Sequence, residues 1–185
     1  MNAIDELIHE HEAVKSTLNI LQRIGADVAA TGKIERPEHL EELFDFFTTF
    51  VDRCHHGKEE ELLFPALERV GISRDGGPVG VMLNEHQQGR ELVAAMQAAV
   101  AAYTRGDAAA AQTFKRHAEA YIELLRFHIE KENQVLFPLA TAHLPADRLD
   151  DLKAGFDRIE AEKIGHGRHA AFHAMLDRLE AAYLQ

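Results

Sequence analysis

The chain has little of several residue types, and each shortage excludes a class of protein. Among its 185 residues there is one cysteine, Cys54, so no disulfide can form within the chain. A reducing compartment, the cytoplasm, is therefore the expected location. Tryptophan is absent and proline occurs only 5 times. Alanine, leucine, glutamate and arginine dominate instead, which favours an all-α fold.

Basic residues and long apolar runs are also scarce. The 20 lysines and arginines are outnumbered by 31 aspartates and glutamates, and the net charge of −11 argues against nucleic acid or an anionic membrane surface as partner. No apolar run approaches the ~18 residues of a membrane span. The opening stretch, MNAIDELIHEHE, has acids where a secretory signal would have lysines. We therefore expect a single domain, residues 1–185, with no membrane or nucleic-acid partner.

Glycine, proline and capping residues divide the chain into helices. The predicted helices cover residues 2–25, 37–70, 79–104, 107–142 and 146–165, and a final short helix ends near residue 183. Long helices joined by short turns pack antiparallel with their neighbours. The sequence therefore predicts an all-α, antiparallel up-down-up-down four-helix bundle over about residues 2–142. A helical extension is expected over about 146–184.

Histidine is the residue type in excess, with 12 copies. One histidine on an apolar helix face is usually a satisfied core residue. Here, four predicted helices each place a histidine on or beside the apolar seam: His11, His55, His86 and His128. In a bundle of this topology all four fall toward one end, within about two or three turns of a common level at ~1.5 Å per residue. Scattered core histidines would have no reason to gather in this way.

Two of these histidines begin copies of one motif, H-x-x-K-E-x-x-x-L-F-P. It reads HHGKEEELLFP from His55 and HIEKENQVLFP from His128. Because positions i and i+4 share a helix face, each copy presents an imidazole beside a carboxylate, Glu59 or Glu132. Burying two unpaired carboxylates costs several kcal/mol each, and a bound metal ion would compensate them. Imidazole and carboxylate together suit iron, manganese or zinc.

The apolar stripe of the second helix predicts which of its two adjacent histidines, His55 or His56, faces inward. His55 lies near that stripe, and at ~100° per residue His56 falls about 100° further round. Aligning the two motif copies also pairs His55 with His128. We therefore expect His55 and Glu59 to be ligands, and His56 and Glu60 to be outer partners of ligands or exposed. The alternative, that His56 and Glu60 replace them, stays open.

The remaining features carry weaker predictions. Each motif ends in a proline, Pro65 or Pro138, which should kink its helix just beyond the ligands, or end it early. Cys54 is expected to be a small core residue. Four histidines are expected at the surface: His9, His39, His117 and His143. His169 and His173 are expected to pack or to support the site, with an auxiliary metal role as the alternative.

The order of these motifs resembles the hemerythrin-like family, also called HHE cation-binding domains. A histidine on the first helix, HxxxE on the second, a histidine on the third and HxxxE before LFP on the fourth carry the resemblance, which covers residues 1 to about 142. It implies a non-haem di-iron site with two Fe ions bridged by an oxygen species and two carboxylates. The implied metal ligands are His11, His55, Glu59, His86, His128 and Glu132.

The sequence differs from the oxygen-carrying hemerythrins at two points. Those proteins have HxxxH on the third helix, where this chain has Arg90 four residues after His86. They have HxxxxD on the fourth helix, where this chain has HxxxE. The set of four histidines and two glutamates is more similar to the di-iron domain of repair-of-iron-centres proteins.

These observations predict a cytoplasmic non-haem di-iron protein that binds, senses or reacts with O2, NO or peroxide. An apolar bundle wall admits a small diatomic ligand or peroxide better than a charged metabolite, and Arg90 or Tyr121 is expected to polarise the pocket. The alternative is an iron storage, donation or sensing module without redox turnover. A dinuclear zinc hydrolase is disfavoured because no substrate cleft or general base is evident, and a purely structural bundle remains the simplest alternative.

Overall fold

The computed structural model describes residues 2–165 and 167–185, and every regular element within them is a helix, which confirms the all-α prediction. None of the described helices is long and apolar enough to cross a bilayer. The α-helices are α1 (Ala3–Thr31), α2 (Pro37–Asp45), α3 (Phe64–Arg69), α4 (Pro78–Thr104), α5 (Ala110–Lys131), α6 (Phe137–His143), α7 (Ala146–Lys163) and α8 (Arg168–Tyr183). Three π-helical segments connect some of them: η1 (Phe46–His56), η2 (Glu59–Leu63) and η3 (Glu132–Leu136).

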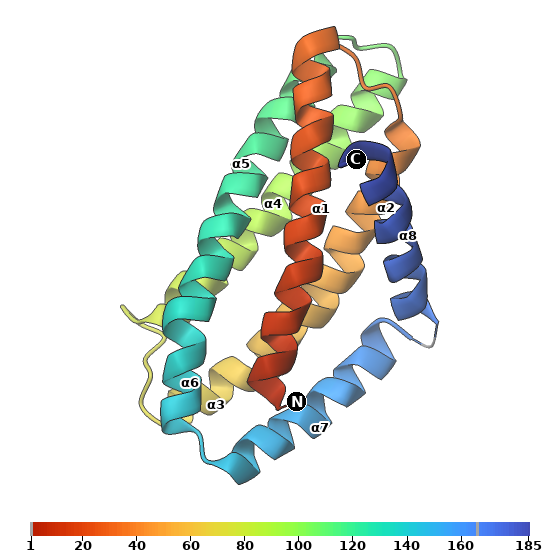
Figure 1. Cartoon of the computed structure of the whole chain (residues 1–185). Coiled ribbons are helices and arrows are strands. Elements are labelled where there is room, and N and C mark those ends of the chain that lie inside the picture. Colours follow the sequence, from red (N-terminus) through yellow and green to blue (C-terminus); the bar gives the residue numbers. More distant parts are fainter. Residues whose placement is uncertain (1, 166) are drawn as a thin grey trace.

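Four long helical runs lie side by side in Figure 1: α1, the run from α2 to α3, α4, and the run from α5 to α6. Helix α4 packs along α5, α5 packs along α1, and η1 packs against α4. The extension folds back on these runs. Helix α7 contacts α1, η1 and η2 near the N-terminus, and α8 lies along α1.

Helix α1 begins where the sequence predicts and ends later. The Asn2 side chain accepts hydrogen bonds from the backbone N–H groups of Ile4 (2.9 Å) and Asp5 (3.0 Å), and Asp5 accepts one from Asn2 in return. The predicted end near Gly25 is wrong, because Gly25 lies inside the helix. The helix ends instead at Gly32, whose φ of 71° only glycine adopts readily.

The two motif copies change from α- to π-helical hydrogen bonding at the same place. In each copy the glutamate begins a π segment, and the phenylalanine before the proline donates its N–H to that glutamate's carbonyl, five residues back. Pro65 and Pro138 then occupy the second position of α3 and α6. A proline has no N–H to donate, and its ring crowds the preceding turn. The backbone there forms a wider π-helical turn in place of an α-helical turn. Neither run ends there.

The other helix boundaries differ little from those predicted. Helix α5 starts at Ala110 rather than at Asp107, whose side chain instead accepts a hydrogen bond from the Ala109 N–H at 3.1 Å. The predicted interruption in the extension is present. Gly165 and Gly167 have φ values of 80° and 88°, and they separate α7 from α8.

The buried apolar side chains form two clusters. One includes Val14, Val51, Val93 and Leu125, and the other includes Leu7, Leu63, Met82 and Leu136. On each of the four long runs, the predicted ligands lie between a member of the first cluster and a member of the second. The fold therefore places a layer of buried polar side chains between two apolar cores.

Candidate metal centre

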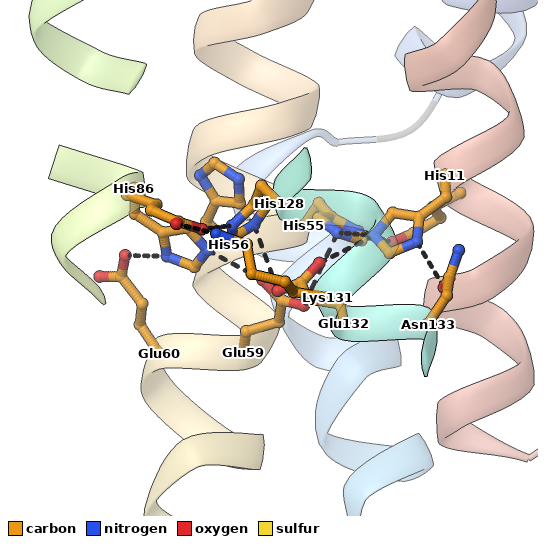
Figure 2. Close-up of polar contacts among 12 residues, drawn as sticks. His11, His55, His56, Glu59, Glu60, His86, His128, Lys131, Glu132 and Asn133 are labelled. Carbon is orange, nitrogen blue, oxygen red and sulfur yellow. Dashed lines mark hydrogen bonds and ion pairs between the residues drawn. The ribbon is translucent and has the colours of Figure 1, made fainter. Parts of the chain in front are cut away.

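The six predicted ligands converge on one place inside the helices (Figure 2). They come from all four long runs, two of which contribute both a histidine and a glutamate, and all are buried, with exposures between 0% and 2%. They are His11 on α1, His55 on η1, Glu59 on η2, His86 on α4, His128 on α5 and Glu132 on η3. Convergence from four runs makes this polar layer a candidate metal centre.

Hydrogen bonds outside the cluster fix how the four imidazoles are oriented. In every ring Nδ1 lies at hydrogen-bond distance from a side-chain oxygen, which can only accept a hydrogen bond. Nδ1 therefore carries the proton, and a neutral ring presents its Nε2 lone pair to the cluster. The pairs are His11 with Asn133 (3.0 Å), His55 with Glu10 (2.8 Å), His86 with Glu60 (2.7 Å) and His128 with Glu85 (3.0 Å).

The inward nitrogens form two pairs. Nε2 of His86 lies 3.2 Å from Nε2 of His128, and this pair is called site A below. Nε2 of His11 lies 3.1 Å from Nε2 of His55, and this pair is called site B. Two lone pairs facing each other at such a distance repel one another, so each site needs a proton or a cation between its rings.

Both glutamates span the two sites. Glu59 and Glu132 each direct one carboxylate oxygen toward a histidine of site A and the other toward a histidine of site B. The distances to Nε2 are Glu59–His55 3.7 Å, Glu59–His86 3.4 Å, Glu132–His128 3.2 Å and Glu132–His11 3.1 Å. Each site therefore has two imidazole nitrogens and one oxygen from each carboxylate, and the carboxylates are placed to bridge two ions.

The electrostatics of the cluster fit a cation. Among the described residues, five buried side-chain atoms lack a hydrogen-bond partner: both oxygens of Glu59, both oxygens of Glu132, and Nδ1 of His56. Burial, reinforced by the charge of Glu132, raises the pKa of Glu59 well above its usual range. Burial lowers the pKa of His128, but Glu132 and Glu85 outweigh it and raise that pKa to about 9. Protons on Glu59 and His128 therefore compensate the same buried negative charge that a metal ion would neutralise.

A second layer of charges supports the imidazoles. Glu10, which accepts from His55, is also bound by Lys58, a lysine that is 0% exposed. Burial opposes the charged form of Glu10, but His55 and Lys58 hold the pKa of this carboxyl at about 2. In the same way Arg90 binds Glu60 and Lys131 binds Glu85. Such outer partners fix the imidazole tautomer and raise ligand basicity.

These contacts follow a pseudo-two-fold pattern that the sequence analysis missed. In each motif copy the histidine and the lysine three residues later share one carboxylate, which comes from the residue just before His11 or His86. The corresponding pairs are Glu10 and Glu85, Lys58 and Lys131, and Glu60 and Asn133. The lysine of H-x-x-K-E and the two Glu-His dipeptides were the signals available in the sequence.

His56 is not where the α-helical register places it. It is buried at 5% exposure, its ring stacks on His86 at 3.7 Å between centroids, and it belongs to one group of candidate ligand atoms with Glu59, His86 and His128. Of the two places predicted for it, outer partner of a ligand or exposed, burial contradicts the exposed one. His56 lies in the π-helix η1. A π-helix has more residues per turn than an α-helix, so consecutive side chains are separated by less than 100° around the axis. His55 and His56 therefore both face inward.

The other histidines among the described residues lie outside the cluster. His9 and His143 are exposed as predicted, and His117 is half-buried. The prediction for His39 is wrong: it is 8% exposed, and its Nδ1 lies 2.9 Å from the hydroxyl of Tyr183, because α8 folds back over α2. His169 bonds Glu160 at 2.9 Å and stacks on the exposed His173. Cys54 is a free, buried core residue as predicted.

A cavity of about 260 Å³ adjoins site A. Its walls include Phe47, Val51, Val93 and Tyr121, and its polar lining includes Asp52, His56 and Arg90. The Arg90 guanidinium is held by Asp52 (2.7 Å) and Glu60 (2.6 Å). The two residues expected to polarise a pocket, Arg90 and Tyr121, thus line the same cavity.

Comparisons with known proteins show what the chain is similar to. The chain is 27% identical over 179 residues to the uncharacterized protein Rv1995 of Mycobacterium tuberculosis. The aligned region covers 97% of this chain and 68% of Rv1995. It is 37% identical over 91 residues to the iron-sulfur cluster repair protein YtfE of an Enterobacter species (48% of this chain, 41% of YtfE). It is 33% identical over 113 residues to YtfE of Edwardsiella ictaluri (60% and 50%). No solved structure gives a significant match.

The sequence model of the hemerythrin HHE cation-binding domain matches residues 2–140. This segment contains both motif copies and all the histidines and glutamates of the cluster. The chain belongs to the hemerythrin HHE cation-binding domain family.

Proposed function

We propose that the cluster is a non-haem di-iron centre, with one iron at site A, one at site B, and Glu59 and Glu132 as bridging ligands. The observation that carries this proposal is the spacing of the donors. Two pairs of Nε2 atoms each face one oxygen from both carboxylates. This donor set suits iron, and zinc or manganese would be substitutes. The supporting fold is the antiparallel up-down-up-down bundle over residues 2–142, with 146–184 as its extension in one domain.

The proposed reaction partner is O2, NO or peroxide. Four protein atoms at each site leave coordination positions open on an ion that prefers five or six ligands, and such an ion supplies redox chemistry when bound. The chain's own residues control access to it. Phe47, Val93 and Tyr121 make the cavity wall apolar, while Asp52 and Arg90 neutralise each other. A small neutral molecule therefore enters this cavity at less desolvation cost than a charged metabolite.

A second candidate is iron storage, donation or sensing without redox turnover. The likeness to proteins named for iron-sulfur cluster repair favours it, although this chain spans at most about half of those proteins. Both candidates use the same metal ligands. They differ in whether the reduced centre reacts with a small oxidant.

Rapid mixing separates the two candidates. The iron-loaded, reduced protein is mixed with O2, NO and hydrogen peroxide in separate stopped-flow experiments, and its visible absorption is followed. The proposal predicts new absorption bands with one or more of these reagents. A protein that holds two irons and gives no spectral change with any of them supports the iron-handling candidate instead.

A further inference from the structure

Two of the positions at which the motif copies differ concern side chains at the site. Ile129 corresponds to His56, and Asn133 corresponds to Glu60. At both positions the group that could support a metal ion lies at site A. His56 groups with the site A histidines, and Glu60 binds His86, whereas the neutral Asn133 binds His11 of site B. The chain therefore gives site A one more imidazole and one more outer carboxylate than site B.

His56 lies close to the donor atoms of site A. Its candidate ligand nitrogen lies within 4.8 Å of the ligand atoms of Glu59, His86 and His128. Atoms bound to one ion at about 2.1 Å are at most about 4.2 Å apart, so small side-chain movements suffice to bring all four onto one ion. The ring is held against His86 by stacking, with an interplanar angle of 12°.

Within residues 2–165 and 167–185, Nδ1 of His56 has no hydrogen-bond partner. The nearest carboxylate is Asp52, at 3.7 Å, which is beyond hydrogen-bond distance. Asp52 is in any case bound to Arg90 at 2.7 Å. The other side-chain atoms in the described part of the chain that are buried and unpartnered are the four oxygens of Glu59 and Glu132. Burying an imidazole whose hydrogen bonds are incomplete is unfavourable, and an ion bound by the ring would offset part of that cost.

We propose that His56 is a further metal ligand at site A, so that this site has three imidazoles and site B has two. The proposal rests on the two-metal centre proposed above and adds a ligand that the H-x-x-x-E motifs do not identify. With five protein atoms at site A and four at site B, the two ions are inequivalent. Site A binds metal more tightly, and site B has more open coordination positions for an external ligand.

The test compares the wild-type protein with His56→Ile, which introduces the residue of the corresponding position, Ile129. Both proteins are loaded anaerobically with ⁵⁷Fe(II), and bound iron and Mössbauer spectra are measured. Zn(II) titration gives the affinities of the two sites without redox chemistry. His39→Gln is the matched control, because it alters a buried histidine that contacts Tyr183 rather than the cluster. His56→Gln serves if the isoleucine variant does not fold.

The proposal predicts two distinct iron signals of equal area in the wild type and in His39→Gln. In His56→Ile the two signals become alike, and the affinity of one zinc site falls by about tenfold or more. Unchanged signals and unchanged affinities in folded His56 variants overturn the proposal, and indicate that His56 only lines the cavity. A wild type that does not bind two ions would instead contradict the proposed function, so the two failures are distinguishable.

Discussion

At the residue scale, each imidazole of the candidate centre is oriented by a side chain that never reaches the metal positions. His55 and His128 donate to Glu10 and Glu85, and the lysine of the same motif copy binds each of these carboxylates. The lysine holds the carboxylate ionised and in place, and the carboxylate holds the imidazole proton on Nδ1. The repeated lysine is therefore part of the site although it binds no metal.

Neutralising either carboxylate should weaken metal binding. Glu10→Gln and Glu85→Gln each leave a group of the same shape but remove the negative charge that raises imidazole basicity. We expect the metal affinity to fall about 10–100-fold in each variant, measured by Zn(II) titration. Glu12→Gln is the control, because Glu12 is on the same helix as Glu10 but is exposed and pairs only with Lys15. Equal affinities in all three variants would show that the outer carboxylates are not coupled to the site.

The thiol of Cys54 should be unreactive in the folded protein. Burial raises its pKa from 9.0 to about 12, so almost no thiolate forms at pH 8. Because the folded pKa lies above the unfolded one, this thiol's contribution to stability is complete below about pH 8 and is lost as the pH rises through 9 toward 12. Iodoacetamide at pH 8 should modify the chain only after unfolding in urea. Rapid labelling of the native protein would contradict the burial of this residue.

At the scale of the elements, the α-helical period predicts most of the fold. It gives most of the helical ranges, the apolar seams and the inward placement of the six residues assigned to the ligand set, among them His11, His86 and His128. It fails for His56, because the stretch from Phe46 to His56 is π-helical and turns less per residue. Contacts between residues far apart in the sequence could not be predicted either. The Glu10–Lys58 pair and the burial of His39 under α8 join segments far apart in the sequence.

The first helix offers a test of local capping. Asn2 accepts hydrogen bonds from two N–H groups at the start of α1, the helix that carries Glu10 and His11. Asn2→Ala should lower the free energy of unfolding by about 1 kcal/mol, measured by urea denaturation of the metal-free protein. Asn2→Asp, which keeps the cap, should have little effect. A loss of similar size in both variants would mean that the cap is not what stabilises this end.

At the scale of the whole molecule, the polar layer separates two apolar cores. The layer contains two buried carboxylates whose oxygens have no hydrogen-bond partner among the described residues. Burying such groups uncompensated is unfavourable by several kcal/mol. Metal binding and the stability of the fold are therefore expected to be coupled.

Removing the metal should lower the thermal midpoint clearly. At a free concentration about 100 times its dissociation constant, each ion contributes ~2.7 kcal/mol, so two ions give about 5 kcal/mol. For a chain of this size that corresponds to roughly 10–20 °C, measured by calorimetry with and without a chelator. Glu59→Gln should reduce the difference in thermal midpoint between the metal-bound and metal-free protein. It removes a buried carboxyl, whose pKa burial raises, from the metal-free form, and it weakens metal binding. An unchanged midpoint on chelation would contradict the coupling.

The most direct test of the di-iron proposal is the number of irons that one chain binds. The protein is loaded with Fe(II) without oxygen, passed through a desalting column, and analysed for iron and protein by elemental and amino-acid analysis. Two sites, each with two imidazoles and an oxygen from both Glu59 and Glu132, predict two irons per chain. One iron per chain, or none, would contradict the account.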